Sequence, residues 1–273
     1  MNSIAEKYIR KETLPFIFCP GCGHGIVVNA FLRVLDKLNI GENEMGLVSG
    51  IGCSSWAPVY IDMDCLHTLH GRALAQAEGL KAVNPDKKVV VFSGDGDCAG
   101  IGGNHLIHAA RRNIDMTVVV FNNNIYGMTG GQFSPTTPTG DFATTAPYGS
   151  IDPDFDIPRL AEAAGATYTA RGTAYHVPQT VKLIENAIAH EGFSLVECVS
   201  VCPTYYGRKN KKGDAVEMLK WQRDNAVPVS KARSMSAEEL KGKIVYGELS
   251  RCERPEYTKE YDKIIAAAGG AKA

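Results

Sequence analysis

The chain has 273 residues, of which 44% are hydrophobic and 22% are charged, and its formal net charge is −1. This length suffices for a large globular core, and the near-zero charge gives no reason to expect binding to nucleic acid or to an anionic membrane. No apolar run approaches the roughly 18 residues that cross a bilayer, and the first residues lack the apolar segment and the cleavage site of a signal peptide. We therefore expect a soluble, cytoplasmic protein without nucleic-acid or membrane partners.

Short apolar runs alternate with stretches of helical periodicity along most of the chain. In chain order, the pattern predicts a helix at 23–38, a strand at 46–50, a helix at 71–83, a strand at 88–93, a helix at 103–112, a strand at 116–121, helices at 157–165 and 176–191, and a strand at 194–201. The strands are short and almost entirely apolar, which is typical of a parallel sheet that is covered on both faces. The predicted fold class is therefore α/β, a mostly parallel sheet with helices on both faces.

The character of the sequence changes at about Tyr205. Residues 207–214 read GRKNKKGD, and the remainder is polar with one helix expected near 257–267. Two interpretations stay open for this part, a solvated tail or an arm that packs on a partner subunit. We expect a first domain at 1–204 and a C-terminal extension at 205–273 that packs on a partner.

A glycine-rich turn follows the strand expected at 88–93, and in it Asp95 stands between Gly94 and Gly96. Ligands of open α/β sheets bind beyond the carboxyl ends of the strands, and glycine lets the backbone approach a bulky group. The helix that follows suits a phosphate at its N-terminus, but the carboxylate would repel a phosphate unless a cation lay between them. The turn therefore predicts a divalent ion such as Mg²⁺, and an ordinary tight turn is the alternative.

The next strand also ends in polar residues, Asn122 to Asn124. Adjacent parallel strands have neighbouring carboxyl ends, so an amide oxygen of Asn123 could bind the same ion as Asp95. Asparagines at a strand end can also be simple turn residues. Rival phosphate motifs are missing, because there is no GxxxxGK[ST] and the glycines of 21–25 and 100–103 complete no dinucleotide motif.

GDGD followed by NNN resembles the signature of thiamine-diphosphate (TPP) enzymes. The resemblance implies that Asp95, Asn123 and the backbone carbonyl of Ile125 hold Mg²⁺ against the diphosphate of the cofactor. On this interpretation, the carboxylate between two glycines is a metal ligand.

The chain has eight cysteines, which in a cytoplasmic protein indicate metal binding or catalysis better than disulfides. Cys19 and Cys22 form a CxxC pair, while Cys53 and Cys202 stand alone. A single CxxC is compatible with zinc, an iron–sulfur cluster or a redox disulfide, and four thiolates suit zinc or a [4Fe–4S] cluster. The other four cysteines also stand alone: Cys65, Cys98, Cys198 and Cys252.

The full set of motifs resembles one family closely, the β (TPP-binding) subunits of the 2-oxoacid:ferredoxin oxidoreductases. The matching motifs are CPGCG, IGC, HTLHGRA, GDGD, NNNIYGMTGGQ and CPT within residues 16–207, with ERPEY at 253–257. The resemblance implies that Cys19, Cys22, Cys53 and Cys202 bind one [4Fe–4S] cluster. It leaves the other four without a role as ligands: Cys65, Cys98, Cys198 and Cys252. It also places His70 beside the diphosphate, where we expect a catalytic residue and cofactor contact. The expected cofactor contacts are Gly52, Ser54, Ser55, His70, Gly94, Asp95, Gly96, Asp97, Asn123, Ile125, Tyr126, Gly127, Met128 and Thr129.

The resemblance implies oxidative decarboxylation of a 2-oxoacid with coenzyme A, giving acyl-CoA and CO₂ while electrons pass through the cluster to ferredoxin. The motif variant is most like the 2-oxoglutarate branch, with branched-chain 2-oxoacids or pyruvate as alternatives. The expected partners are an α subunit, ferredoxin and further small subunits. Two other classes stay open, a non-redox TPP lyase with structural zinc and a zinc-binding regulatory protein. The hydroxyl-rich segment 129–140 is expected to face the substrate, with a plain surface loop as the alternative.

Overall fold

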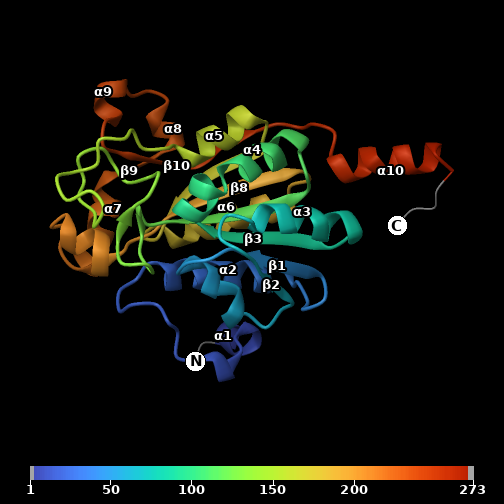
Figure 1. Cartoon of the computed structure of the whole chain (residues 1–273), viewed down its shortest axis with the longest axis horizontal. Coiled ribbons are helices and arrows are strands. Elements are labelled where there is room, and N and C mark those ends of the chain that lie inside the picture. The colour runs from blue at the N-terminus through green and yellow to red at the C-terminus, as the bar shows by residue number, and fades with distance from the viewer. Residues whose placement is uncertain (1–2, 270–273) are drawn as a thin grey trace.

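The apolar runs form strands and the periodic stretches form helices in the computed structural model, which describes residues 3–269. Eight strands make one sheet: β1 (Met45–Ser49), β2 (Cys65–His67), β3 (Lys88–Gly94), β4 (Met116–Asn122), β7 (Tyr168–Thr173), β8 (Phe193–Val199), β9 (Ala226–Pro228) and β10 (Ile244–Arg251). Their order in the sheet is β2-β1-β3-β4-β8-β7-β10-β9 (Figure 1). All neighbouring strands are parallel except β7 and β10, which are antiparallel.

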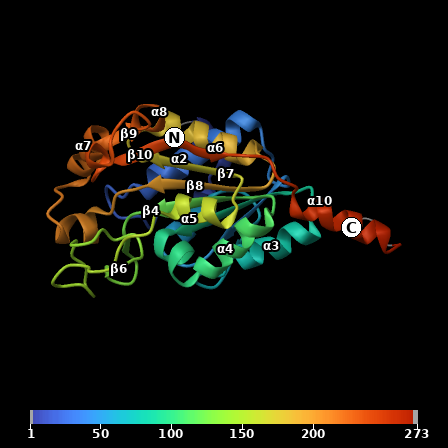
Figure 2. The ribbon, with the colours of Figure 1, turned by 90° about the horizontal axis from the view of Figure 1, so that it is seen from above.

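Helices cover both faces of this sheet, as Figure 2 shows. The helices of one face are α2 (His24–Leu38) and α6 (Val177–Ala189), with α1 (Ser3–Tyr8) against α2; those of the other are α3 (Ala73–Val83), α4 (Gly103–Arg112) and α5 (Ile157–Ala164). Under α2, the ring of Phe31 meets Phe92 edge-on at 4.8 Å between centroids, and Phe92 meets Phe121 at 5.6 Å. Each such fully buried side chain stabilises the fold by about 1.5–3 kcal/mol. The predicted α/β fold is confirmed.

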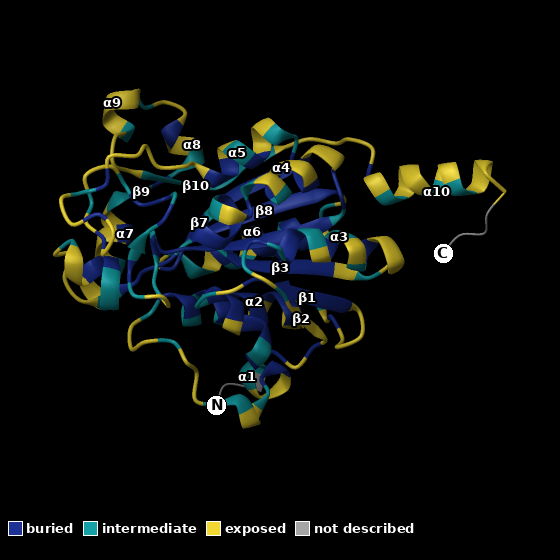
Figure 3. Cartoon of the chain, viewed as in Figure 1, coloured by how far each residue is buried: buried dark blue, intermediate teal, exposed yellow. Residues whose placement is uncertain are grey.

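The segment after Tyr205 contributes to the sheet. It contains α7 (Ala215–Asn225), β9, α8 (Val229–Ala232), α9 (Ala237–Leu240) and β10, and β10 pairs with β7 through a register shift between Glu248 and Ser250. Residues 244–251 are therefore part of the main body and not a free tail. The helix expected near 257–267 is present as α10 (Tyr257–Ala267), which projects from the body with no buried residue (Figures 1 and 3). Packing of the extension on a partner stays a prediction.

Two interior strands have no counterpart among the predicted elements, the partly buried β10 and the more deeply buried β7. The β7 sequence YTARGT mixes threonine, arginine and glycine, so the apolar run that marks the other strands is missing. Its arginine, Arg171, is nevertheless accommodated because Nε donates to the buried carboxylate of Glu197 on β8. Within residues 3–269, no helix is both long enough and apolar enough to cross a membrane.

Candidate cofactor site and cysteine cavity

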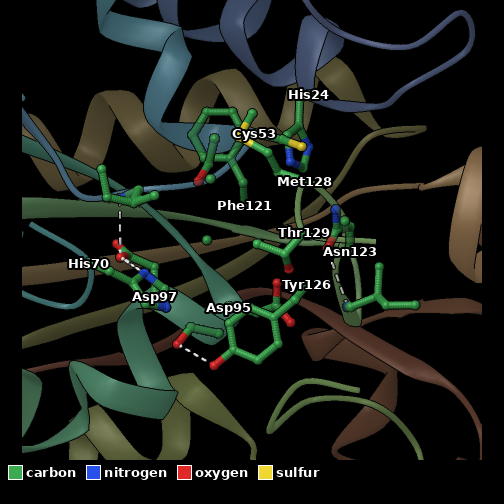
Figure 4. Close-up of a pocket in the computed structure, with 17 residues that line it drawn as sticks. His24, Cys53, His70, Asp95, Asp97, Phe121, Asn123, Tyr126, Met128 and Thr129 are labelled. Atoms are coloured by element: carbon green, nitrogen blue, oxygen red, sulfur yellow. Dashed lines mark hydrogen bonds and ion pairs between the residues drawn. The ribbon is translucent and has the colours of Figure 1, made fainter. Parts of the chain in front are cut away.

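A cavity of about 190 Å³ lies beyond the carboxyl ends of β1, β3 and β4 (Figure 4). The parallel register sets Gly94 of β3 beside Phe121 of β4, so the turns that follow both strands meet here. Every predicted cofactor contact except Ser55 lines the cavity: Gly52, Ser54, His70, Gly94, Asp95, Gly96, Asp97, Asn123, Ile125, Tyr126, Gly127, Met128 and Thr129. The motifs therefore identified one continuous surface.

Ser55 is not brought to this cavity. It lies in a short 3₁₀ segment, Ser54–Tyr60, that turns its side chain inward, and it is fully buried with no hydrogen-bond partner for Oγ. Three lining residues were not predicted, His24, Ile51 and Phe121. His24 lies in GCGHG, Ile51 in IGC and Phe121 in FNNN. Their position next to residues of the predicted motifs was the only sequence signal that could have placed them in the cavity.

Asp95 is one of two buried carboxylates of the site, the other being Asp97. Asp95 is 2% exposed, and its Oδ2 accepts hydrogen bonds from Ser134 Oγ at 2.5 Å and Thr136 Oγ1 at 2.6 Å. Burial raises the pKa of Asp95 to about 6, although the two hydroxyls act in the opposite direction. In the part of the chain that the structure describes, no ion pair reaches this carboxylate.

The turn that carries Asp95 is tied to the loop that carries Asn123. Tyr126 donates from its hydroxyl to the carbonyl of Gly96 at 3.0 Å, and a Cβ at position 96 would lie 2.2 Å from the Tyr126 ring. Glycine is therefore required for this approach. Asn123 is buried, and its Oδ1 accepts from the backbone amide of Ile125 at 3.3 Å. Asp95, Asn123 and Ile125 thus come together at one wall of the cavity.

Asp97 has a different environment from Asp95. Its carboxylate accepts from Nδ1 of His70 at 2.7 Å, the amide of Gly71 at 2.7 Å, Oγ of Ser93 at 2.6 Å and the amide of Ile51 at 3.3 Å. It therefore joins the loops that follow β1, β2 and β3. Because a carboxylate with these donors accepts from Nδ1–H, Nε2 is the His70 nitrogen left for a ligand.

A second cavity, of about 240 Å³, is lined by all four cysteines of the predicted ligand set: Cys19, Cys22, Cys53 and Cys202. A Cβ at Gly127 would lie 3.7 Å from Sγ of Cys53 and 3.9 Å from Sγ of Cys202. Burial, reinforced by neighbouring thiols, raises the pKa of Cys22 to about 12 and that of Cys53 to about 11. Within the described residues, no three His, Cys, Asp or Glu side chains converge on a single metal-ion position; the four sulfurs instead surround a shared space.

The two cavities share one wall, formed by Cys53, Asn123, Gly127 and Met128. His24 lines the first cavity, and burial lowers its pKa to about 4, so the ring is neutral at physiological pH. Its Nδ1 lies 3.0 Å from Oγ of Ser200. The other cysteines lie outside both linings: Cys98 and Cys198 are buried in the core, and Cys65 and Cys252 are exposed.

The hydroxyl-rich segment 129–140 differs from expectation. Thr129 lines the first cavity, but Ser134, Thr136 and Thr137 are each 2–3% exposed and point toward Asp95 and the backbone of Asn124. The prediction that these hydroxyls face a substrate is therefore wrong for those three residues. Ser134 and Thr136 instead donate to the carboxylate of Asp95, and Thr137 donates to the carbonyl of Asn124.

Comparisons with known proteins agree with this geometry. Residues 40–198 match the family described as thiamine pyrophosphate enzyme, C-terminal TPP binding domain. The chain is 56% identical over 261 residues to the 2-oxoglutarate synthase subunit KorB of Methanocaldococcus jannaschii, covering 96% of this chain and 97% of the relative. It is 43% identical over 190 residues to the 2-oxoacid:ferredoxin oxidoreductase subunit beta of Saccharolobus solfataricus, covering 69% of this chain and 62% of that one.

A solved structure has the same architecture. It is the 2-oxoglutarate:ferredoxin oxidoreductase from Magnetococcus marinus with 2-oxoglutarate, coenzyme A and succinyl-CoA bound; the TM-score is 0.88 at 36% identity, covering 99% of this chain and 92% of that chain. The family resemblance of the sequence motifs is thereby confirmed. The chain belongs to the β subunits of the 2-oxoacid:ferredoxin oxidoreductases, which are enzymes of several subunits, and it is similar to the 2-oxoglutarate branch.

Proposed function

We propose that this chain binds TPP and Mg²⁺ in the first cavity and one [4Fe–4S] cluster in the second. With an α subunit, it would convert 2-oxoglutarate and coenzyme A to succinyl-CoA and CO₂, and pass the two electrons singly to ferredoxin. The observation that carries the proposal is the shared wall, because Cys53, Asn123, Gly127 and Met128 border both cavities. A cofactor that releases electrons and a cluster that accepts them would then be neighbours.

The residues of the first cavity fit a magnesium diphosphate. Mg²⁺ prefers oxygen ligands, commonly a carboxylate together with substrate phosphates, and Asp95 is a buried carboxylate without a cation among the described residues. Asp95 would hold the ion together with Asn123 and the carbonyl of Ile125, and Nε2 of His70 would contact the cofactor. TPP, when bound, supplies the electron sink for decarboxylation. The lining residues of the cavity would orient this group.

The residues of the second cavity fit an iron–sulfur cluster. Four cysteine thiolates bind a [4Fe–4S] cluster, and here four thiols from three chain segments surround one space. Gly21, in the loop of Cys19 and Cys22, packs closely against Ala215 and Pro203. A Cβ at Gly21 would lie only 2.4 Å from Cβ of Ala215 and 3.6 Å from Cγ of Pro203, so only glycine allows this approach. Packing of Gly21 on Ala215 and Pro203 therefore helps to place the CxxC loop beside the other cysteines.

The first cavity indicates why a partner subunit is needed. Its described lining contains no glutamate, although TPP enzymes generally use one at the aminopyrimidine ring. Two apolar lining residues are also left exposed at the opening, Ile51 at 41% and Met128 at 44%. The name β subunit carried by its relatives implies an α subunit, which we propose covers this opening and supplies the glutamate. The neighbour that contains coenzyme A supports its role as the co-substrate here.

The proposal is tested on the chain co-expressed with its α subunit and purified without oxygen. Iron, sulfide, zinc, magnesium and TPP are quantified, and reduction of ferredoxin is then measured with 2-oxoglutarate, pyruvate and branched-chain 2-oxoacids in the presence of coenzyme A. We expect bound TPP, iron and sulfide in the ratio of a [4Fe–4S] cluster, and preference for 2-oxoglutarate. A colourless zinc protein would contradict the redox function, and preference for another acid would contradict the substrate assignment.

A further inference from the structure

Two buried hydroxyls occupy one oxygen of Asp95. Ser134 Oγ and Thr136 Oγ1 both lie within hydrogen-bond distance of Oδ2, at 2.5 and 2.6 Å, and both side chains are 2–3% exposed. Within residues 3–269, no side-chain hydroxyl contacts Oδ1. An ionised carboxylate oxygen offers about two lone-pair sites, so the two hydroxyls fill those of Oδ2 and leave Oδ1 as the oxygen for an ion. The backbone amides of Asp95 and Asn123 also stabilise this carboxylate.

The loop that presents these hydroxyls is anchored to β4. Thr137 Oγ1 accepts from the amide of Ser134 at 2.8 Å and donates to the carbonyl of Asn124 at 2.6 Å. Pro135, between the two hydroxyl residues, approaches the turn after Asp95, because a Cβ at Gly100 would lie 3.5 Å from its Cγ. The hydroxyls are therefore held in place by backbone and packing contacts on both sides.

A buried polar chain supports the loop from the other side. Oγ1 of Thr136 lies 3.0 Å from Oδ1 of Asn122, whose Nδ2 donates to Oε1 of Glu197 at 2.8 Å. The other oxygen of Glu197 pairs with Arg171, and Arg171 reaches Asp156 at 2.7 Å. The single proton of the Thr136 hydroxyl goes to Asp95, so this hydroxyl makes no second hydrogen bond to Asn122. The contact places Thr136 beside polar residues that run across β4, β8 and β7.

Saturation of one carboxylate oxygen has a consequence for the choice of metal ion. Mg²⁺ demands near-octahedral geometry at short distances, whereas Ca²⁺ takes six to eight oxygens and accepts bidentate carboxylates. A carboxylate with one oxygen already occupied can bind only through the other. We propose that Ser134 and Thr136 are positioning residues that make Asp95 a one-oxygen ligand and so favour Mg²⁺ over Ca²⁺ beside the diphosphate. This inference rests on the proposed TPP site.

The experiment measures metal-dependent TPP binding and not turnover. The complex with the α subunit is stripped of divalent ions and TPP, and TPP is titrated calorimetrically with either Mg²⁺ or Ca²⁺ present. Removal of outer-shell partners typically costs 10–100-fold in metal affinity. For Ser134→Ala combined with Thr136→Val, we expect Mg²⁺-supported affinity to fall by about 10–100-fold. Because the freed Oδ2 serves Ca²⁺ better, the Mg²⁺/Ca²⁺ preference should fall about tenfold, the lower end of that range.

Two variants separate the hydroxyl contact from general damage. Thr136→Ser keeps the hydroxyl that contacts Asp95, and Ser194→Ala removes a buried hydroxyl that has no partner. Both should keep the wild-type preference. Circular dichroism and iron content report whether each variant is folded. If the double variant does not fold, the Mg²⁺/Ca²⁺ preference is measured in Ser134→Ala and in Thr136→Val separately.

A wild-type Mg²⁺/Ca²⁺ preference in folded variants that lack the hydroxyls overturns the inference. An equal loss of preference in Ser194→Ala also overturns it, because loss of a buried hydroxyl in general and not of contact with Asp95 would then set the selectivity. Failure of the wild-type complex to bind TPP with any divalent ion would instead refute the proposed TPP site. The two failures are therefore distinguishable.

Discussion

The wall between the two cavities depends on a few side chains. A Cβ on Gly127 would lie 3.7 Å from Sγ of Cys53 and 3.9 Å from Sγ of Cys202. The same Cβ would lie 3.9 Å from Nδ2 of Asn123. A predicted metal-ion ligand and two predicted cluster ligands therefore surround one residue. At this scale, the proposed function makes separate predictions for the thiols and for the carboxylate.

We expect Cys53→Ala to abolish the EPR signal of the reduced cluster, because removal of one of four thiolates leaves an iron without its protein ligand. The matched control is Cys252→Ala, since Cys252 is exposed and lies outside both cavities. The control should retain the signal and the iron content. An intact signal in the Cys53 variant would refute the ligand assignment.

We expect Asp95→Asn to lower Mg²⁺-dependent TPP affinity by about 10–100-fold, the scale seen when metal-site support is removed. The amide keeps the shape of the side chain but not the charge that balances the cation. Asp62→Asn is the control, because Asp62 is an exposed carboxylate outside the cavity lining. Calorimetric titration of both variants with TPP checks this, and equal affinities would exclude Asp95 as a ligand.

At the scale of elements, the cysteine cavity depends on how α7 begins. Asp214 caps this helix in a capping box with Glu217, and the first helical residue, Ala215, packs on Gly21 of the CxxC loop. α9 begins with a similar capping box, formed by Ser236 and Glu239, but it contains no buried residue. The two helices therefore offer a matched pair of caps, one beside the cavity and one away from it.

We expect Asp214→Ala to cost about 1 kcal/mol, as typical for loss of an N-cap, and to speed loss of the cluster to an iron chelator. Loosening of the start of α7 would release Gly21 and with it Cys19 and Cys22. Ser236→Ala should leave the rate of chelation unchanged, because α9 does not border the cavity. Chelation is followed by visible absorbance, and equal rates in both variants would show that the cap does not support the cysteine loop.

The parallel part of the fold was predictable from sequence, because strands such as β3 and β4 are nearly continuous apolar runs. The first cavity was predictable because its lining is concentrated in turns directly after those strands. β10 was not, since IVYGELSR is only partly buried and pairs with a strand that also lacks an apolar run. The contact between Asp95 and Ser134 was not predictable either, because the residues are 39 positions apart and a hydroxyl-rich segment reads as a surface or substrate loop.

At the scale of the whole molecule, the chain carries surfaces that it does not cover itself. One is the opening of the first cavity, where Ile51 and Met128 are exposed. Another is α10, which extends from the body in both ribbon views (Figures 1 and 2). Contiguous exposed apolar groups commonly mark sites of protein association. Both surfaces are therefore expected to be covered in the assembled enzyme.

We expect the chain alone to be inactive even after its cluster and TPP are restored. No glutamate lies in the described lining of the first cavity, and Glu197, which is buried nearby in β8, is already paired with Arg171 and Asn122. The assay is viologen reduction with 2-oxoglutarate and coenzyme A, with the co-expressed complex as the positive control. Turnover by the lone chain comparable to that of the complex would contradict the need for a partner.

The exposed face of α10 leads to the last prediction. Tyr257, Tyr261 and Ile264 follow one another at helical spacing and are 39%, 52% and 63% exposed. We propose that this face packs on a partner subunit of the enzyme. Full burial of one such side chain contributes about 1.5–3 kcal/mol, and these two are already about half-buried. Tyr261→Ser with Ile264→Ser should therefore weaken assembly by about tenfold to a hundredfold, at about 1.4 kcal/mol per tenfold.

The matched control for α10 is Lys263→Ser, which changes an exposed residue between the two altered positions that pairs only with Glu260 among the described contacts. Size-exclusion chromatography with light scattering, at falling protein concentration, compares the mass of the three complexes. The double variant should dissociate at concentrations where the wild type and the control remain assembled. TPP affinity should be unchanged in complexes that are still intact, because α10 contributes no residue to either cavity. If the double variant stays assembled down to the same protein concentration as the wild type, α10 is a solvated helix. That is the other interpretation that the polar C-terminal sequence allows.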